Sequence, residues 1–301
     1  MMKLRELCQA LHQNFPSMLL LETEPMAKHT SFQIGGNAAM AFPASVEELT
    51  ALYRFCMQND HHPLILGAGS NVLAPDAGLD RLVICTKQVN RITLLDDTTI
   101  EASCGATMTR LAAFARDRGL TGLEFAHGIP GTVGGGTYMN AGAYGGEIKQ
   151  VAAATTALLP DGTLWEAVGE DQKFSYRHSV FEETNALILK TRFSLKKGDM
   201  DAIGETMKEL AQKRRASQPL EWPSAGSTFK RPVGGFAAAL IDQAGLKGQG
   251  VGDAVVSEKH AGFVINKGSA TASDVLAAME LIKQTVYSYS GILLEPEVRI
   301  W

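Results

Sequence analysis

The sequence has 301 residues, of which 45% are hydrophobic and 20% are charged, and 28 basic against 32 acidic residues give a net charge of −4. This composition is that of an ordinary soluble globular protein, and the length predicts two or three domains. A weakly acidic chain without a basic field excludes nucleic acid and an anionic membrane as main partners. A small anionic ligand held by a few local cations remains compatible with it.

The four cysteines lie far apart, with no C-x-x-C pair and no Cys/His cluster: Cys8, Cys56, Cys85 and Cys104. They predict buried, reduced thiols in a cytosolic protein, and neither a disulfide framework nor a zinc site. The histidines His12, His61 and His62 are scattered and are expected to be exposed, not to bind metal. The N-terminus lacks the apolar run of a signal peptide, and no 18-residue apolar segment exists. We therefore expect a cytoplasmic protein.

The hydrophobic pattern changes character near residue 199. Helices are predicted at 3–15, 45–58, 107–118, 200–217, 236–244 and 273–287, the second one opened by a capping box of Ser45 and Glu48. Strands are predicted at 63–66, 81–86, 91–103 with a turn at 96–97, 151–159, 163–167, 186–195 and 292–301. The predicted domains are 1–86, 87–198 and 199–301.

Residues 128–146 form the most unusual stretch, because eight of these 19 residues are glycine. Flexible linkers alternate Gly with Ser, whereas here small residues alternate with apolar ones. Glycine lets consecutive N–H groups converge on an anion, and the Asn140 amide could recognise a planar ligand edge. The pattern favours a cofactor cradle over the alternative, a tightly packed structural turn.

A second loop, Gly67-Ala-Gly-Ser-Asn71, follows the predicted strand at 63–66. It begins like a dinucleotide fingerprint, but Val72 stands where the third glycine would be, and Pro75 prevents the helix that a Rossmann loop opens. The chain also lacks a P-loop pattern. A strand followed by free N–H groups and a serine hydroxyl suits a pyrophosphate. Two such loops could wrap one extended ligand with a planar ring, and FAD fits best.

Three polar residues have both an ordinary and a functional reading. Arg177, flanked by Tyr176 and His178, could form a surface or interdomain ion pair, or its planar fork could hold a carboxylate or an enolate. Ser227 lacks a G-x-S-x-G elbow and is no triad nucleophile; loop serines usually bond the backbone. Glu297 shares a predicted strand face with Glu295, where a surface charge ladder is the ordinary reading.

Six motifs follow one another along almost the whole chain: Thr30-Ser-Phe-Gln-Ile-Gly-Gly36, Leu66-Gly-Ala-Gly-Ser-Asn71, Gly128-Ile-Pro-Gly131 through Asn140-Ala-Gly-Ala143, Tyr176-Arg-His-Ser179, Ser224-Ala-Gly-Ser-Thr-Phe-Lys230 and Leu294-Glu-Pro-Glu-Val-Arg299. In this order they resemble the UDP-N-acetylenolpyruvoylglucosamine reductase family, flavoenzymes that complete the muramic acid precursor of bacterial peptidoglycan. The short spacing between Arg177 and Ser227 resembles the compact subtype, which lacks an extra substrate-capping loop.

The resemblance implies an α+β fold: a two-subdomain FAD-binding region of the vanillyl-alcohol-oxidase type, followed by a smaller C-terminal α+β substrate-binding domain. Its last strand is expected to return toward the flavin. It implies a ping-pong reaction in which NADPH reduces non-covalently bound FAD, and UDP-N-acetylglucosamine enolpyruvate is then reduced to UDP-N-acetylmuramate. Hydride transfer to the vinyl carbon places negative charge on the adjacent carbon and its carboxylate.

The resemblance also implies roles for single residues. Arg177 would hold the carboxylate and stabilise the enolate, Glu297 would hydrogen-bond it if protonated, and Ser227 would be the general acid. The implied cofactor-binding residues are Gly67, Ala68, Gly69, Ser70, Asn71, Gly128, Ile129, Pro130, Gly131, Gly134, Gly135, Asn140, Ala141, Gly142 and Ala143. The implied substrate-binding residues are Lys230, Arg231 and His260.

Two rival functions remain open. One is another FAD-dependent oxidoreductase on the same scaffold with a different small-molecule substrate, which would share the glycine loops but not Ser227 with Glu297. The other is a non-catalytic nucleotide-sensing protein, in which Arg177 and these two residues would be incidental.

Overall fold

The structure is a computed structural model that describes residues 3–301, and its contacts divide the chain into two units. The first unit contains the residues up to Glu22, Ala39–Ala68 and Asp80–Lys213; the second contains Thr23–Ala38, Gly69–Leu79 and Arg214–Trp301. Two N-terminal segments therefore belong with the C-terminal residues. The predicted division at 86/87 and 198/199 stays a prediction.

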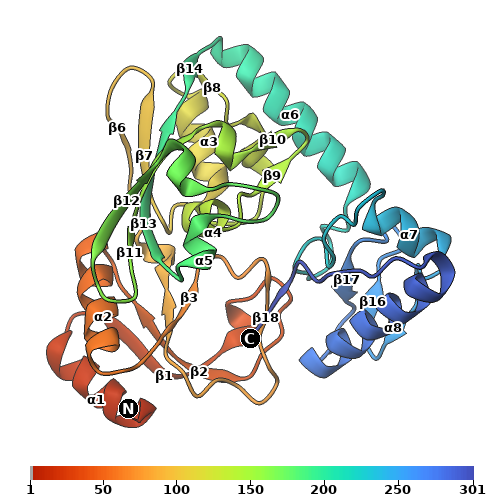
Figure 1. Ribbon diagram of the computed structural model, residues 1–301, viewed down its shortest axis with the longest axis horizontal. Helices are drawn as coiled ribbons and strands as arrows, with labels where there is room; N and C mark the ends of the chain where they lie inside the picture. The colour runs from red at the N-terminus through yellow and green to blue at the C-terminus, as the bar shows by residue number, and fades with distance from the viewer. Residues whose placement is uncertain (1–2) are drawn as a thin grey trace. The chain divides into compact units, whose positions relative to one another are not determined.

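The first unit begins with a four-stranded sheet and two helices (Figure 1). The sheet has the order β1-β2-β5-β3, built from β1 (Leu19–Pro25), β2 (Asn37–Phe42), β5 (Val83–Cys85) and β3 (Leu64–Leu66). The helices are α1 (Leu4–Asn14) and α2 (Val46–Gln58). Ser45 caps α2 by accepting from the Glu48 N–H at 3.1 Å. The Glu48 carboxylate reaches back one residue further than predicted, to the Ala44 N–H at 2.7 Å.

A five-stranded antiparallel sheet, β12-β11-β13-β7-β6, forms the rest of this unit's framework. Its strands are β6 (Ile92–Leu94), β7 (Thr99–Ser103), β11 (Ala152–Leu158), β12 (Leu164–Val168) and β13 (Leu187–Ser194). The helices of this part are α3 (Met108–Arg116), α4 (Val133–Tyr138), α5 (Val180–Glu183) and most of α6 (Met200–Ser217). The short pairs are β8 (Leu120–Thr121) with β14 (Lys196–Lys197) and β9 (Gly142–Ala143) with β10 (Gly146–Glu147).

The second unit packs a small sheet against helices. The sheet has the order β15-β16-β17, built from β15 (Gly250–Val251), β16 (Ala254–Val256) and β17 (Val264–Asn266), and the helices are α7 (Ala237–Gln243) and α8 (Ala272–Ser290) (Figure 1). The last strand, β18 (Arg299–Ile300), runs parallel to β4 (Val72–Leu73), directly after the loop at 67–71. Short 3-10 turns complete the chain at Met26–Lys28, Thr86–Gln88, Glu124–Gly128, Ile148–Gln150 and Gly169–Gln172.

The cores follow the predicted periodicity. All four cysteines are buried and free, as predicted, and burial raises the pKa of the Cys104 thiol to about 12. The second unit has its own core, in which Phe32 and Leu73 from the N-terminal segments join Ile241, Val275 and Ile282 from α7 and α8. Within residues 3–301, no helix combines the length and apolar character that crossing a membrane requires.

Two expectations for the elements are wrong. The C-terminal strand predicted over 292–301 is reduced to Arg299–Ile300. The residues before it form only an isolated bridge, between Pro296 and Phe229, and single backbone hydrogen bonds beside it. The sequence pattern also missed β1, β2 and the strands of the small sheet. The strands of the small sheet have only two or three residues, and β1 and β2 contain runs of apolar or small residues, so none of them shows a clear alternation.

His61 is buried, with 6% of its surface exposed, in contrast to the prediction. Its Nε2 accepts a hydrogen bond from the Leu82 N–H at 3.1 Å, which requires an unprotonated nitrogen. Burial first, and the nearby Arg81 charge second, lower the pKa of His61 below its ordinary value of 6.5. His61 is therefore a structural side chain that joins the end of α2 to the segment before β5.

We expect acidification to destabilise the protein partly through His61. The unfolded chain takes up a proton at His61 near pH 6.5, whereas the folded chain takes it up only at lower pH. The contribution of His61 to the free energy of unfolding is therefore fully present above pH 6.5 and is lost as the pH falls below it. Each unit of lowered pKa corresponds to about 1.4 kcal/mol. Urea unfolding of His61→Gln across pH 5 to 8 should show a shallower pH slope than the wild type. His62→Gln, at an exposed neighbour, is the matched control, and an equal change in both variants would contradict this assignment.

Candidate active site

The loop at 67–71 offers a run of backbone donors. Among residues 3–301, no acceptor is found for the N–H groups of Ala68, Gly69 and Ser70. Ala68 and Ser70 are half-buried, so these N–H groups lie near the protein surface and are not paired within a β-sheet. Consecutive N–H groups of this kind form a concave site that suits a phosphate anion. The residues present therefore fit the pyrophosphate of a dinucleotide.

Two glycines of this loop are required by close approaches. Gly67 packs against Thr132 of the second glycine-rich stretch, and a Cβ at Gly67 would lie 2.3 Å from Thr132 Oγ1. The two loops predicted to share one ligand thus meet within the first unit. Gly69 has φ +69°, and a Cβ there would lie 2.0 Å from the His29 carbonyl oxygen. No other residue fits either position without moving backbone or the capping threonine.

The glycine-rich stretch is in part a short helix. Thr132 caps α4, and the Gly134 N–H donates to the Cys104 carbonyl at 2.8 Å. A Cβ at Gly134 would lie 2.8 Å from Cys104 Cβ, so this glycine serves packing. The predicted residues divide by exposure: Gly134, Asn140 and Ala141 are buried, Gly128, Ile129, Gly131, Gly142 and Ala143 are half-buried, and Pro130 and Gly135 are exposed. The open positions are those whose backbone a cofactor can reach.

Asn140 is fully buried and its amide is used inside the protein. Its Nδ2 donates to Glu147 Oε2 at 2.8 Å and to the Ser175 carbonyl at 3.0 Å, and its Oδ1 accepts from the Lys149 N–H at 2.9 Å. Both amide hydrogens are therefore occupied, which leaves no donor for a ligand edge. The side chain holds the loop together, and a contact between this residue and the cofactor stays a prediction.

Arg177 lies in a tight turn of the first unit. Ser175 and His178 exchange both backbone hydrogen bonds, at 3.1 and 3.2 Å, and leave Tyr176 and Arg177 at the tip. Arg177 has φ +55°, a left-handed conformation that is costly for a residue with a long side chain. Its guanidinium lies over the Tyr176 ring, with Cζ 5.1 Å from the ring centre. The turn thus presents a half-buried cation in a conformation that the surrounding fold must maintain.

Ser227 and Glu297 come together in the second unit. They flank one hydrogen bond, because the Glu297 N–H donates at 2.8 Å to the carbonyl of Thr228, the residue after Ser227. Both are half-buried, and the Ser227 hydroxyl makes no hydrogen bond to another residue of 3–301. Asn71, the last residue of the glycine loop, donates from Nδ2 to the Glu297 carbonyl at 3.0 Å. Hydrogen bonds to backbone carbonyls therefore connect the end of the glycine loop at Asn71 to the segments that carry Ser227 and Glu297.

Ser31 is a further residue of these connected segments that sequence reasoning missed. Its hydroxyl donates to the Ser224 carbonyl at 2.6 Å and lies 3.3 Å from the Gly69 carbonyl, and its N–H donates to Gly69 as well. It ties the cofactor loop to the segment that carries Ser227. Ser31 lies within the Thr30–Gly36 motif, but a single serine in an irregular segment gives no sequence signal of such a long-range contact.

The three predicted substrate-binding residues also lie in the second unit. Lys230 Nζ is 3.6 Å from Glu295, and the Arg231 guanidinium lies 4.4 Å above the Phe236 ring. His260 packs edge-on against Phe263, and its Nδ1 accepts from the Gly262 N–H at 3.2 Å. Burial lowers the pKa of His260, which favours the neutral ring with its proton on Nε2. Such a ring can donate one hydrogen bond to a ligand.

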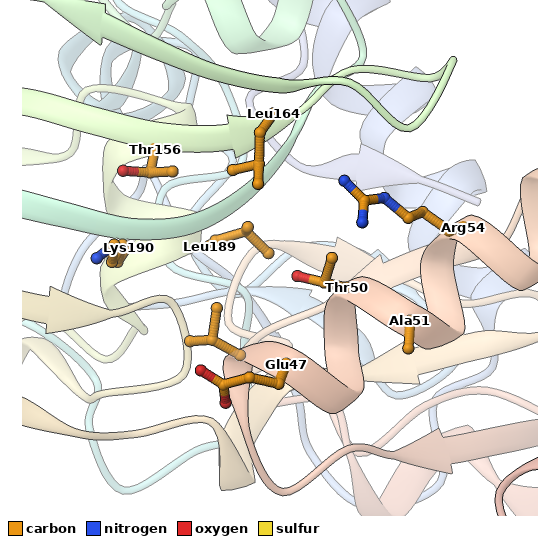
Figure 2. Close-up of a pocket in the computed structure, with 9 residues that line it drawn as sticks. Glu47, Thr50, Ala51, Arg54, Thr156, Leu164, Leu189 and Lys190 are labelled. Carbon is orange, nitrogen blue, oxygen red and sulfur yellow. The ribbon is translucent and has the colours of Figure 1, made fainter.

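A separate hollow of about 590 Å³ lies in the first unit between α2 and the five-stranded sheet. Figure 2 shows Thr50 and Arg54 on the helix facing Leu164 and Leu189 on the strands. Arg54 is held by the Gly162 carbonyl at 3.0 Å. None of the predicted site residues lines this hollow, whose walls carry Glu47, Arg54 and Lys190 among apolar side chains. The hollow is therefore not part of the predicted site.

Replacing Gly69 by alanine tests the close approach in the loop. We expect loss of bound flavin and destabilisation on the order of 2 kcal/mol or more, because the methyl group meets a backbone oxygen at a left-handed φ. Gly291→Ala is the matched control, since Gly291 has φ +71° and nothing near its Cβ. Flavin content and urea unfolding measure both effects. Equal losses in the two variants would show that φ alone, and not the His29 contact, fixes this position.

Comparison with known proteins shows the family of this chain. Residues 37–167 match an FAD binding domain, and residues 218–301 match the C-terminal domain of UDP-N-acetylenolpyruvoylglucosamine reductase. The UDP-N-acetylenolpyruvoylglucosamine reductase of Agathobacter rectalis is 44% identical over 304 residues, covering 97% of each chain. That of Clostridium novyi is 45% identical, covering 91% of this chain and 90% of the relative. The crystal structure of the Thermus caldophilus enzyme has a TM-score of 0.79 at 32% identity, covering 94% of this chain and 99% of that one. The chain belongs to the UDP-N-acetylenolpyruvoylglucosamine reductase family.

Proposed function

We propose that this protein reduces UDP-N-acetylglucosamine enolpyruvate to UDP-N-acetylmuramate, with NADPH as the electron donor and FAD as the bound cofactor. The observation that carries the proposal is the cluster of Asn71, Ser227 and Glu297, which joins a dinucleotide-type loop to a free hydroxyl and a carboxyl group. Family membership supports the same reaction.

FAD, when bound, supplies a hydride to the vinyl group of the substrate. The residues of the protein then have to manage the negative charge that develops on the substrate carbon and its carboxylate. Ser227 donates its hydroxyl proton to that carbon, which is basic enough to take a proton even from a weak acid. Glu297, protonated, donates a hydrogen bond to the developing enolate. Arg177 binds the substrate carboxylate with its guanidinium fork and offsets the new charge.

The remaining predicted residues divide between cofactor and substrate. The open backbone of the two glycine-rich loops holds FAD through its N–H groups, and FAD is bound without a covalent bond. Lys230 and Arg231 supply the positive charge for the substrate diphosphate, and the neutral His260 ring donates a hydrogen bond. The free, buried cysteines support a reducing, cytoplasmic location.

An anaerobic absorbance titration of the purified holoprotein tests the proposal. NADPH should bleach the flavin band, and UDP-N-acetylglucosamine enolpyruvate should then restore it. Bleaching without recovery would keep the FAD-dependent oxidoreductase and require a different acceptor. A flavin band that NADPH does not bleach would favour a nucleotide-sensing role. The absence of a flavin band after FAD is added would overturn the cofactor assignment. FAD is expected to be released by acid, and flavin that stays with the denatured protein would contradict non-covalent binding.

A further inference from the structure

We propose that Asn140 is a positioning residue for Arg177: its buried amide ties the glycine-rich cofactor loop to the turn that carries this arginine. The inference rests on the proposed role of Arg177 and deepens it. It assigns to Asn140 a role different from direct recognition of the flavin, and all of the contacts that carry it lie within the first unit.

The three hydrogen bonds of Asn140 reach two segments. Oδ1 and one Nδ2 contact hold the loop itself, through the Lys149 N–H at 2.9 Å and Glu147 Oε2 at 2.8 Å. The other Nδ2 contact, at 3.0 Å, is to the carbonyl of Ser175. That same carbonyl accepts the His178 N–H that closes the Arg177 turn. Asn140 therefore bonds directly to the base of the turn.

A second tie holds the other end of the turn. Ser179 is fully buried, and its hydroxyl donates at 2.6 Å to the carbonyl of Tyr138, two residues before Asn140. The turn is thus fastened on both sides, at Ser175 and at Ser179, to the same stretch of three residues.

A buried polar chain supports the approach to the turn. Thr137 of α4 lies 3.1 Å from Thr191 through their hydroxyl oxygens, Thr155 reaches Thr191 at 3.3 Å, and Thr155 donates to Gln172 at 2.8 Å. All four side chains are fully buried. Gln172, the last member of this polar chain, lies five residues before Arg177. The glycine-rich stretch and the arginine segment therefore form one connected hydrogen-bonded body.

The turn needs such support because it is strained. Arg177 has φ +55°, a conformation that a non-glycine residue leaves unless the surroundings fix it. A guanidinium stabilises a developing charge only if it is already in place when the charge appears. Misplacement by about 1 Å costs about 10²-fold in rate. We call the hydrogen bonds of Asn140 and Ser179 to the two ends of the turn the clamp. The clamp fixes the arginine relative to the loop that carries the cofactor.

Asn140→Asp tests the clamp, because it keeps the side-chain size, the tolerance for φ +45° and the acceptor for Lys149, but removes both donors. We expect flavin reoxidation by the enolpyruvyl substrate to slow about 10- to 100-fold at saturating substrate and FAD, with reduction by NADPH changed less than about threefold. Asn185→Asp makes the same change at an exposed asparagine with φ +51°, and should match the wild type. Ser179→Ala removes the second tie and serves if Asn140→Asp does not fold.

Two further readouts separate positioning from general damage. Hydrogen exchange of the flavin-free protein should show faster exchange of the 173–179 segment in Asn140→Asp and Ser179→Ala, and no change in Asn185→Asp. In an Arg177→Ala background, Asn140→Asp should slow reoxidation by less than about twofold further, because the residue through which it acts is gone. Equal slowing with and without Arg177, or unchanged exchange and rate in both clamp variants, would overturn the inference. An Arg177→Ala variant that reoxidises at the wild-type rate would instead overturn the proposed role of the arginine.

Discussion

Replacing Ser227 with alanine is expected to slow reoxidation of the reduced flavin by the enolpyruvyl substrate about 10²- to 10⁴-fold. The alanine cannot donate a proton to the substrate carbon, and within residues 3–301 the Ser227 hydroxyl makes no hydrogen bond that its loss would remove. Reduction of FAD by NADPH uses no proton from this residue and should change less than about threefold. Stopped-flow absorbance of the flavin band measures the two half-reactions separately.

Ser290→Ala is the control for this change in the same unit. At the end of α8 the Ser290 hydroxyl donates to the Val286 carbonyl at 2.8 Å and accepts from the Ile292 N–H at 3.2 Å, so its loss removes two local bonds and no group of the predicted site. Both half-reactions should stay at the wild-type rate in this variant. If Ser227→Ala reoxidises as fast as Ser290→Ala, another group or water donates the proton, and the general-acid role of Ser227 is wrong.

Local patterns predicted most of the elements because they depend on neighbours in sequence. Ser45 caps α2 by accepting the N–H three residues later, as its capping box predicted. The predicted strands at 151–159 and 163–167 pair as β11 and β12 across a turn with the left-handed Gly162. These features involve contacts over a few residues, which a pattern in the chain can carry.

Long-range assembly could not be predicted in the same way. Asp76, an unremarkable residue after a glycine loop, accepts from the backbone of Ala272 at 2.7 Å and of Ser273 at 3.0 Å. It fastens Gly69–Leu79 to the start of α8, nearly two hundred residues away. β18 completes the same arrangement by pairing with β4. No periodicity links these segments, so a pattern in the sequence does not reveal that they pack together.

The candidate site shows the same division. The glycine loops were recognisable because their composition is unusual, and the meeting of Gly67 with Thr132 agrees with the idea of a shared ligand. The pairing of Ser227 with Glu297 rests on family motifs, since their segments are joined only by long-range bonds such as that from Glu297 to Thr228. For Asn140, residue type and the family motif suggested a ligand contact, whereas burial and three internal bonds assign its side chain to the fold.

Replacing Glu297 by glutamine is expected to slow flavin reoxidation by the enolpyruvyl substrate, at saturating concentration, about 10²- to 10³-fold. Glutamine keeps the shape of the side chain, and the backbone bonds to Thr228 and Asn71 do not involve the carboxyl group. The variant therefore tests the acid itself. If the protonated acid is the active form, the wild-type rate falls as the carboxyl group ionises with rising pH, whereas the glutamine variant loses this part of the pH dependence.

Glu295→Gln provides the matched control for this second change. Glu295 has the same chemistry two residues earlier, but its side chain is 76% exposed and lies 3.6 Å from Lys230 Nζ. We expect its rate of reoxidation at saturating substrate, and the pH profile, to stay close to those of the wild type. A Glu297 variant that keeps the wild-type profile would show that the carboxyl group does not act as an acid during reoxidation. Similar slowing in both variants would point to the loss of negative charge near Lys230, and not to a proton or hydrogen bond supplied by Glu297.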